Sequence, residues 1–94
     1  MAEKMNILSF DFIIRPGETI KEALAEKGMT QEELAIRTGF SHKYISKVIN
    51  GRKDISLLLA KRLQYVFGIP TSFWINLQEI YDEEINKMET SKTE

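Results

Sequence analysis

The stretch Thr30–Gly51 constrains this chain more than any other, because it predicts two short helices with a sharp turn between them. Thr30 is a suitable N-cap, and Glu33, three positions later, is placed to complete a capping box. Gly39 ends the first helix and Ser41 caps the second. We therefore expect two amphipathic helices joined at Gly39.

The second of these helices, Ser41–Asn50, has two distinct sides. Ile45, Val48 and Ile49 fall together at 3.6-residue periodicity. The opposite side carries Lys43, Ser46, Lys47 and Asn50. A helix anchored to the core by one stripe can place the opposite stripe in the DNA major groove, which is how a recognition helix works.

The side chains of this region supply donors for bases and phosphates. Candidate base contacts are His42, Lys43, Ser46 and Lys47, and candidate backbone contacts are Gln31, Tyr44, Asn50, Arg52 and Lys53. Each also has a plainer interpretation. Surface lysines are commonly just solvated, His42 lies at the side of the polar face, and the ring of Tyr44 suits packing.

The net charge of −1 hides an asymmetry along the chain. Residues 30–62 contain seven basic and three acidic residues, for a net charge of +4, whereas residues 63–94 contain two basic and six acidic residues, for −4. The seven basic residues are Arg37, Lys43, Lys47, Arg52, Lys53, Lys61 and Arg62. A basic middle segment favours phosphate binding there and a different role for the acidic end.

Helical patterns also flank this stretch, so an all-α fold is expected. Pro16-Gly17-Glu18 suits a helix start, and Gly28 suits its end. Ser56 begins a further helix with an apolar stripe of Leu59, Ala60, Leu63 and Phe67. Thr71 or Ser72 caps a last helix with the apolar positions Phe73, Trp74, Leu77, Ile80, Tyr81, Ile85 and Met88. The prediction is an N-terminal arm at 1–15, a helix-turn-helix domain at 16–70, and a C-terminal helix and tail at 71–94, with Thr90–Glu94 as a frayed end.

Two apolar segments lack an obvious place in one small core. Residues 7–14 alternate like a β-strand, but one strand cannot stand alone. We therefore expect these residues either to lie across the helices or to pair with a second copy of the chain. The last helix keeps its apolar stripe beyond the expected end of the domain, which favours a partner surface. The candidate dimer or partner residues are Phe10, Phe12, Tyr81, Ile85 and Met88.

Several classes of protein are excluded by composition. With no cysteine among 94 residues, there is no disulfide framework or cysteine nucleophile. No apolar run predicts a membrane span or a secretion signal, so we expect a cytoplasmic protein. The single histidine and the absence of a Gly-rich phosphate loop or metal-spaced pair argue against an enzyme, a metal site or a cofactor.

The stretch Thr30–Gly51 resembles XRE/Cro-type helix-turn-helix proteins. The resemblance lies in its successive elements Thr-Gln-x-x-Leu-Ala, Gly, Ser, Ile-Ser and Ile-Asn-Gly. Pro-Gly-Glu before it and Phe-Trp-x-Asn-Leu-Gln-x-x-Tyr-Asp after it resemble the HigA/VapI-type antitoxins, the plasmid-maintenance antidote proteins. This resemblance implies a five-helix lambda-repressor-like domain that binds a palindromic double-stranded operator as a homodimer. It also implies repression of its own operon and neutralisation of a RelE-like mRNA-cleaving toxin. By position it puts Gln31 and Ser41 on the DNA backbone and His42, Lys43 and Lys47 on bases.

Other functions remain open at this stage. The chain would also suit an XRE-type regulator without a toxin, or a protein-interaction module, including the N-terminal part of a peptidase-fused regulator. A module that had lost DNA binding would have no reason to keep a charge of +4 in residues 30–62, which favours the DNA-binding alternative.

Overall fold

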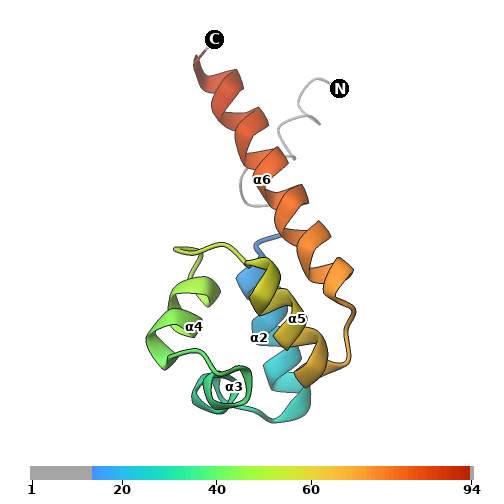
Figure 1. The fold of residues 1–94 in the computed structure, drawn as a ribbon. Helices are drawn as coiled ribbons and strands as arrows, with labels where there is room; N and C mark the ends of the chain where they lie inside the picture. The colour runs from blue at the N-terminus through green and yellow to red at the C-terminus, as the bar shows by residue number, and fades with distance from the viewer. Residues whose placement is uncertain (1–13, 94) are drawn as a thin grey trace.

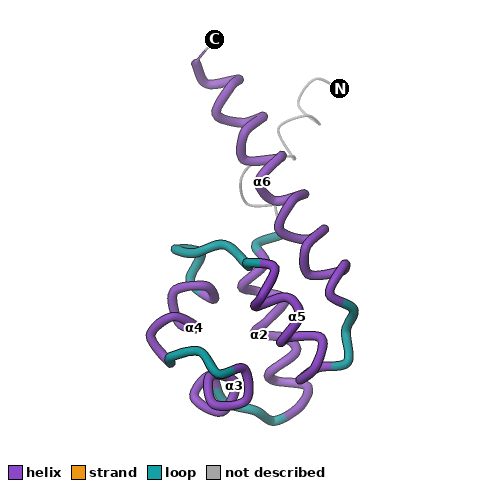
Figure 2. The backbone as a smooth tube through the Cα atoms, viewed as in Figure 1, coloured by secondary structure: helices purple, strands orange, loops and turns teal. Residues whose placement is uncertain are grey.

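Residues 14–93 are described by a computed structural model, and they form five helices and no strand. The helices are α2 (Pro16–Lys27), α3 (Gln31–Thr38), α4 (His42–Ile49), α5 (Leu57–Phe67) and α6 (Thr71–Thr93). The first four gather into a small body joined by short loops, and α6 runs along this body and then projects from it (Figures 1 and 2). The all-α prediction is confirmed over this range, and residues 1–13 of the proposed arm, with Phe10 and Phe12, lie outside it.

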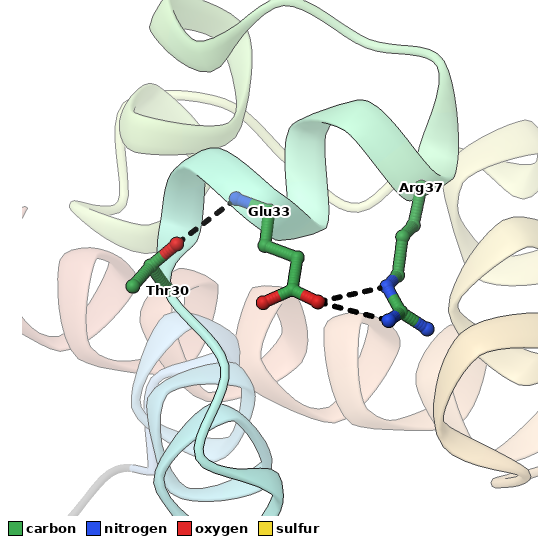
Figure 3. Close-up of polar contacts among 3 residues, drawn as sticks. All are labelled: Thr30, Glu33 and Arg37. Atoms are coloured by element: carbon green, nitrogen blue, oxygen red, sulfur yellow. Dashed lines mark hydrogen bonds and ion pairs between the residues drawn. The ribbon is translucent and has the colours of Figure 1, made fainter.

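The predicted N-caps of the middle helices are present. The hydroxyl oxygens of Thr30, Ser41 and Ser56 each accept a hydrogen bond from the backbone N–H three residues later. The capping box at Thr30 is only half formed, however (Figure 3). The Glu33 carboxylate does not return to Thr30 but accepts two bonds from the Arg37 guanidinium, at 2.9 and 3.2 Å. Two charged N–H donors one turn ahead, which share the same Glu33 carboxylate oxygen, outcompete the single backbone donor behind it.

The core forms where the apolar stripes of all five helices meet. Its largest fully buried side chains include Ile20, Leu34, Ile45, Leu63 and Trp74. Helix α5 packs against α3 and α6, while α2 packs against α4 and α6. The predicted apolar stripes of α4 and α5 are buried in this core and are therefore confirmed.

Helix α6 departs from its prediction at both ends. Thr71 is its first residue rather than its cap, and the backbone N–H and hydroxyl of Thr71 both donate to Oε1 of Gln64. The helix also continues to Thr93, where a frayed tail was expected. Within the described part of the chain, no helix is long and apolar enough to span a membrane.

The stripe of α6 is also narrower than its sequence suggests. Trp74 is fully buried, but Phe73 and Ile80, which belong to the same set of apolar positions, are 42% and 58% exposed and lie outside the core. Phe73 instead meets the Trp74 ring edge-on, with ring centroids 5.2 Å apart. One side of a long helix contacts the body, and the flanking apolar positions face outward.

Gly17 marks the closest approach of two helices. A Cβ atom added at Gly17 would lie 2.0 Å from the carbonyl oxygen of Ile49 and 2.9 Å from the Ile49 Cα. The first turn of α2 thus rests directly on the backbone at the end of α4. The glycine is required for space, because its position inside a helix needs no unusual backbone angle.

We predict that Gly17→Ala lowers the free energy of unfolding by about 1–3 kcal/mol, because the methyl group forces α2 and α4 apart. Urea unfolding followed by circular dichroism measures this. Glu22→Ala, at an exposed site of the same helix, is the matched control and should change stability by less than about 0.5 kcal/mol. Equal stability of the Gly17→Ala and parent proteins would contradict the close packing.

Candidate nucleic-acid interface

Helix α4 is anchored by one side and leaves the other open. Ile45, Val48 and Ile49 are 1%, 2% and 4% exposed, as the sequence predicted. On the opposite side, Lys43 is exposed and Ser46 and Lys47 are half-buried, and His42 is exposed at the edge of this polar side. Lys43 and Lys47 form no ion pair within the described residues. The four candidate base contacts therefore lie on one short helix, and none of them forms an ion pair with another described residue.

The turn before α4 is held from outside by α5. Gly39 has a φ of +81°, which an L side chain rarely adopts, and its N–H donates to the carbonyl of Ala35. The Arg62 guanidinium donates to the carbonyl of Thr38, the last residue of α3. It also lies over the ring of Phe40, 6.0 Å from the centroid. Arg62 thus ties α5 to the turn that joins the two helices.

This contact continues into α4 through aromatic stacking. The rings of Phe40 and Tyr44 stack with centroids 4.7 Å apart and planes at 23°. Tyr44 is half-buried and its ring packs in this contact, while the contact of its hydroxyl with the DNA backbone stays a prediction. A series of contacts from Arg62 through Phe40 to Tyr44 orients the start of α4 against the body.

The end of α4 is closed by a Schellman motif. The N–H of Gly51 donates to the carbonyl of Val48, and the N–H of Arg52 donates to the carbonyl of Lys47. Gly51 has a φ of +82°, the left-handed conformation that this motif requires. The backbone of Arg52 is therefore fixed relative to α4, while its side chain and that of Lys53 remain exposed.

The remaining backbone-contact candidates lie around these helices. Gln31 is the first residue of α3 and is half-buried, and Ser41 uses its hydroxyl oxygen to cap α4. Asn50 is exposed, and its amide donates weakly to the Ser46 hydroxyl at 3.4 Å. The hydroxyls of Ser41 and Ser46 can still donate to a phosphate, because each only accepts in these contacts.

The basic surface predicted for residues 30–62 is smaller than its composition suggests. Arg37 is paired with Glu33, and Arg62 is occupied at the turn. The basic side chains of this segment that form no ion pair or hydrogen bond with the described residues are Lys43, Lys47, Arg52, Lys53 and Lys61. Four of these five belong to α4 or to the loop that follows it, so the available positive charge is concentrated there.

The candidate partner residues of α6 are only partly covered. Tyr81, Ile85 and Met88 are half-buried. Tyr81 lines a groove of about 360 Å³ with residues from the start of α2 and the end of α4.

Over the described residues there is no group of three or more side chains able to hold a metal ion.

Sequence reasoning missed three residues that shape this region. Gly17 and Arg62 are described above, and the third is Gln78, a polar residue that is only 8% exposed. Gln78 bonds to the loop between α4 and α5. A glutamine between apolar positions of a helix is the one local signal that could have indicated a buried polar contact.

Comparison with known proteins supports a DNA-binding interface. The model of the helix-turn-helix family HTH_3 matches residues 20–74. The HTH-type transcriptional regulator y4dJ of Sinorhizobium fredii is 34% identical over 53 residues, covering 56% of this chain and 69% of that protein.

Two solved structures have the same fold. One is described as an antidote protein of a plasmid maintenance system from Nostoc punctiforme, with 30% identity, a TM-score of 0.81, and coverage of 85% of this chain and 88% of that one. The other is the antitoxin HigA of Pseudomonas aeruginosa with the higBA promoter, with 28% identity, a TM-score of 0.80, and coverage of 86% and 89%.

Proposed function

The chain belongs to the XRE-type helix-turn-helix family HTH_3, and on that premise we propose that it is a sequence-specific repressor and the antitoxin of a toxin–antitoxin pair. The DNA-binding part of this proposal rests on one observation, the division of α4 into a buried apolar side and an open polar side. The similarity to HigA with its promoter supports the repressor role. This role requires no catalysis and acts in the cytoplasm, where operator DNA is found.

In this proposal one set of residues contacts bases and a second set contacts phosphates. Lys43, Ser46, Lys47 and His42 enter the major groove and contact base edges. Arg52 and Lys53, in the loop after α4, contact phosphates, together with Gln31 and Ser41 at the two helix starts. Base contacts select the sequence, whereas phosphate contacts set affinity and register.

Lys47→Ala should lose about 1–3 kcal/mol of operator binding while its affinity for scrambled DNA stays near that of the parent. Arg52→Ala should weaken binding to both DNAs alike and reduce the salt slope by about 1. Fluorescence anisotropy over a salt series, with the DNA upstream of the gene as operator, measures both. If the parent bound operator and scrambled DNA equally, the specificity proposal would fail.

A palindromic operator requires two copies, with half-sites about 34–36 Å apart. We propose that the copies meet through the projecting part of α6, where Ile85 and Met88 are only half-buried and Ile80 is 58% exposed. Phe10 and Phe12, which lie outside the described residues, join this surface in the proposal.

Ile85→Asp should therefore convert a dimer to a monomer in gel filtration with light scattering, because a carboxylate is costly in an apolar interface. Lys87→Asp, at an exposed site two residues away, is the control and should leave the dimer in place. A parent protein that stayed monomeric at high concentration would refute the interface.

If the chain is an antitoxin, as proposed, a short reading frame for a basic protein should lie beside its gene. Its expression alone should arrest growth, because the proposed partner is an mRNA-cleaving toxin, and co-expression of this chain should restore growth. A chromosomal test is to delete this gene with and without its neighbour. Viability of the single deletion, together with a harmless neighbour, would favour an XRE-type regulator without a toxin.

A further inference from the structure

Gln78 is a buried amide that uses all of its main hydrogen-bonding groups. Its Oε1 accepts from the backbone N–H of Ile55 at 2.8 Å. Its Nε2 donates to Oδ1 of Asp54 at 3.3 Å and to Oδ1 of Asp82 at 3.0 Å. Two of these bonds come from a side chain that is only 8% exposed and form a clasp between α6 and the loop that joins α4 to α5, whereas the bond to Asp82 lies within α6.

This loop carries two of the proposed phosphate contacts, Arg52 and Lys53. Its first part is fixed to α4 by the bond from the Arg52 N–H to the Lys47 carbonyl. Its last part is fixed to α6 by the Gln78 bond to Ile55, directly before the Ser56 cap of α5. Arg52 and Lys53 therefore lie between two anchors, one on the recognition helix and one on α6.

Gln78 also restrains a carboxylate next to these basic residues. Asp54 follows Lys53 in the chain, and an acid in that position would pair with a neighbouring cation or repel a phosphate. Neither Arg52 nor Lys53 pairs with Asp54 in the described structure, and the Asp54 carboxylate instead accepts from the Gln78 amide. The clasp thus leaves both cations available.

We propose that Gln78 is a positioning residue for DNA binding, which holds the loop of residues 50–56 so that Arg52 and Lys53 meet phosphates. Gln78 touches no DNA itself. This inference rests on the proposed DNA-binding function and adds to it a residue on a helix outside the two paired helices.

The test is Gln78→Met in the full chain, which keeps the length of the side chain and removes its hydrogen bonds. Operator affinity should fall about tenfold at 0.1 M salt, and the slope of log affinity against log salt should fall by about 1, as for the loss of one phosphate contact. Discrimination between operator and scrambled DNA should be unchanged, because α4 keeps its place. Partial unfolding would instead lower affinity by the same factor at every salt concentration.

Hydrogen exchange gives a readout that needs no DNA. The Ile55 amide should lose protection in Gln78→Met, because its acceptor is gone, while the amide of Leu63 in the buried part of α5 should keep its protection. Asn76→Ala, at an exposed site of α6, is the matched control and should change neither exchange nor DNA binding. If Gln78→Met is unfolded, Gln78→Glu takes its place: it keeps an acceptor for Ile55 but repels Asp54 and Asp82, and it should still lower the salt slope.

The outcomes separate the two proposals. If the parent shows no preference for operator DNA, the proposed function fails. If the parent binds operator DNA and the folded Gln78 variants bind it with an unchanged salt slope, only the positioning role of Gln78 is overturned.

Discussion

The fit of α4 into the body is the constraint on which the rest of the structure depends. A helix of eight residues is too short to be stable alone, so α4 exists because Ile45, Val48 and Ile49 are buried. The backbone of Ile49 also rests against Gly17, where an added Cβ atom would clash with the Ile49 carbonyl. The packing that stabilises α4 also fixes the direction of its polar side. The stability of α4 and the orientation of its polar residues toward DNA therefore have one physical cause.

Charge in this small chain is divided between structure and binding. Arg37 and Arg62 are engaged by a carboxylate and a backbone carbonyl, whereas Lys43, Lys47, Arg52 and Lys53 make no such contacts within residues 14–93. A chain with a net charge of −1 can therefore present a basic surface on α4 and its following loop. Local charge, rather than net charge, governs attraction to a polyanion at the contact distance.

Features that depend on neighbours along the chain were predictable. The caps at Thr30, Ser41 and Ser56 and the stripe on α4 follow from spacings of three and four residues. The predictions that were wrong concern a side chain with two competing hydrogen-bond partners and a helix whose buried side depends on how it packs against other helices. Glu33 pairs with Arg37 rather than Thr30, and α6 buries Trp74 but not Phe73 or Ile80, because the periodic pattern does not say how wide the contact is.

The sequence by itself determined the order of the helices, where most of them begin and end, and the two sides of the recognition helix, because each depends on residues within one or two turns. Only the tertiary structure decided the roles of Gly17, Arg62 and Gln78. Each acts across 20 or more residues of chain, on Ile49, Thr38 and Ile55 respectively. Their partners are set by how the helices pack in space, and no local pattern records that packing.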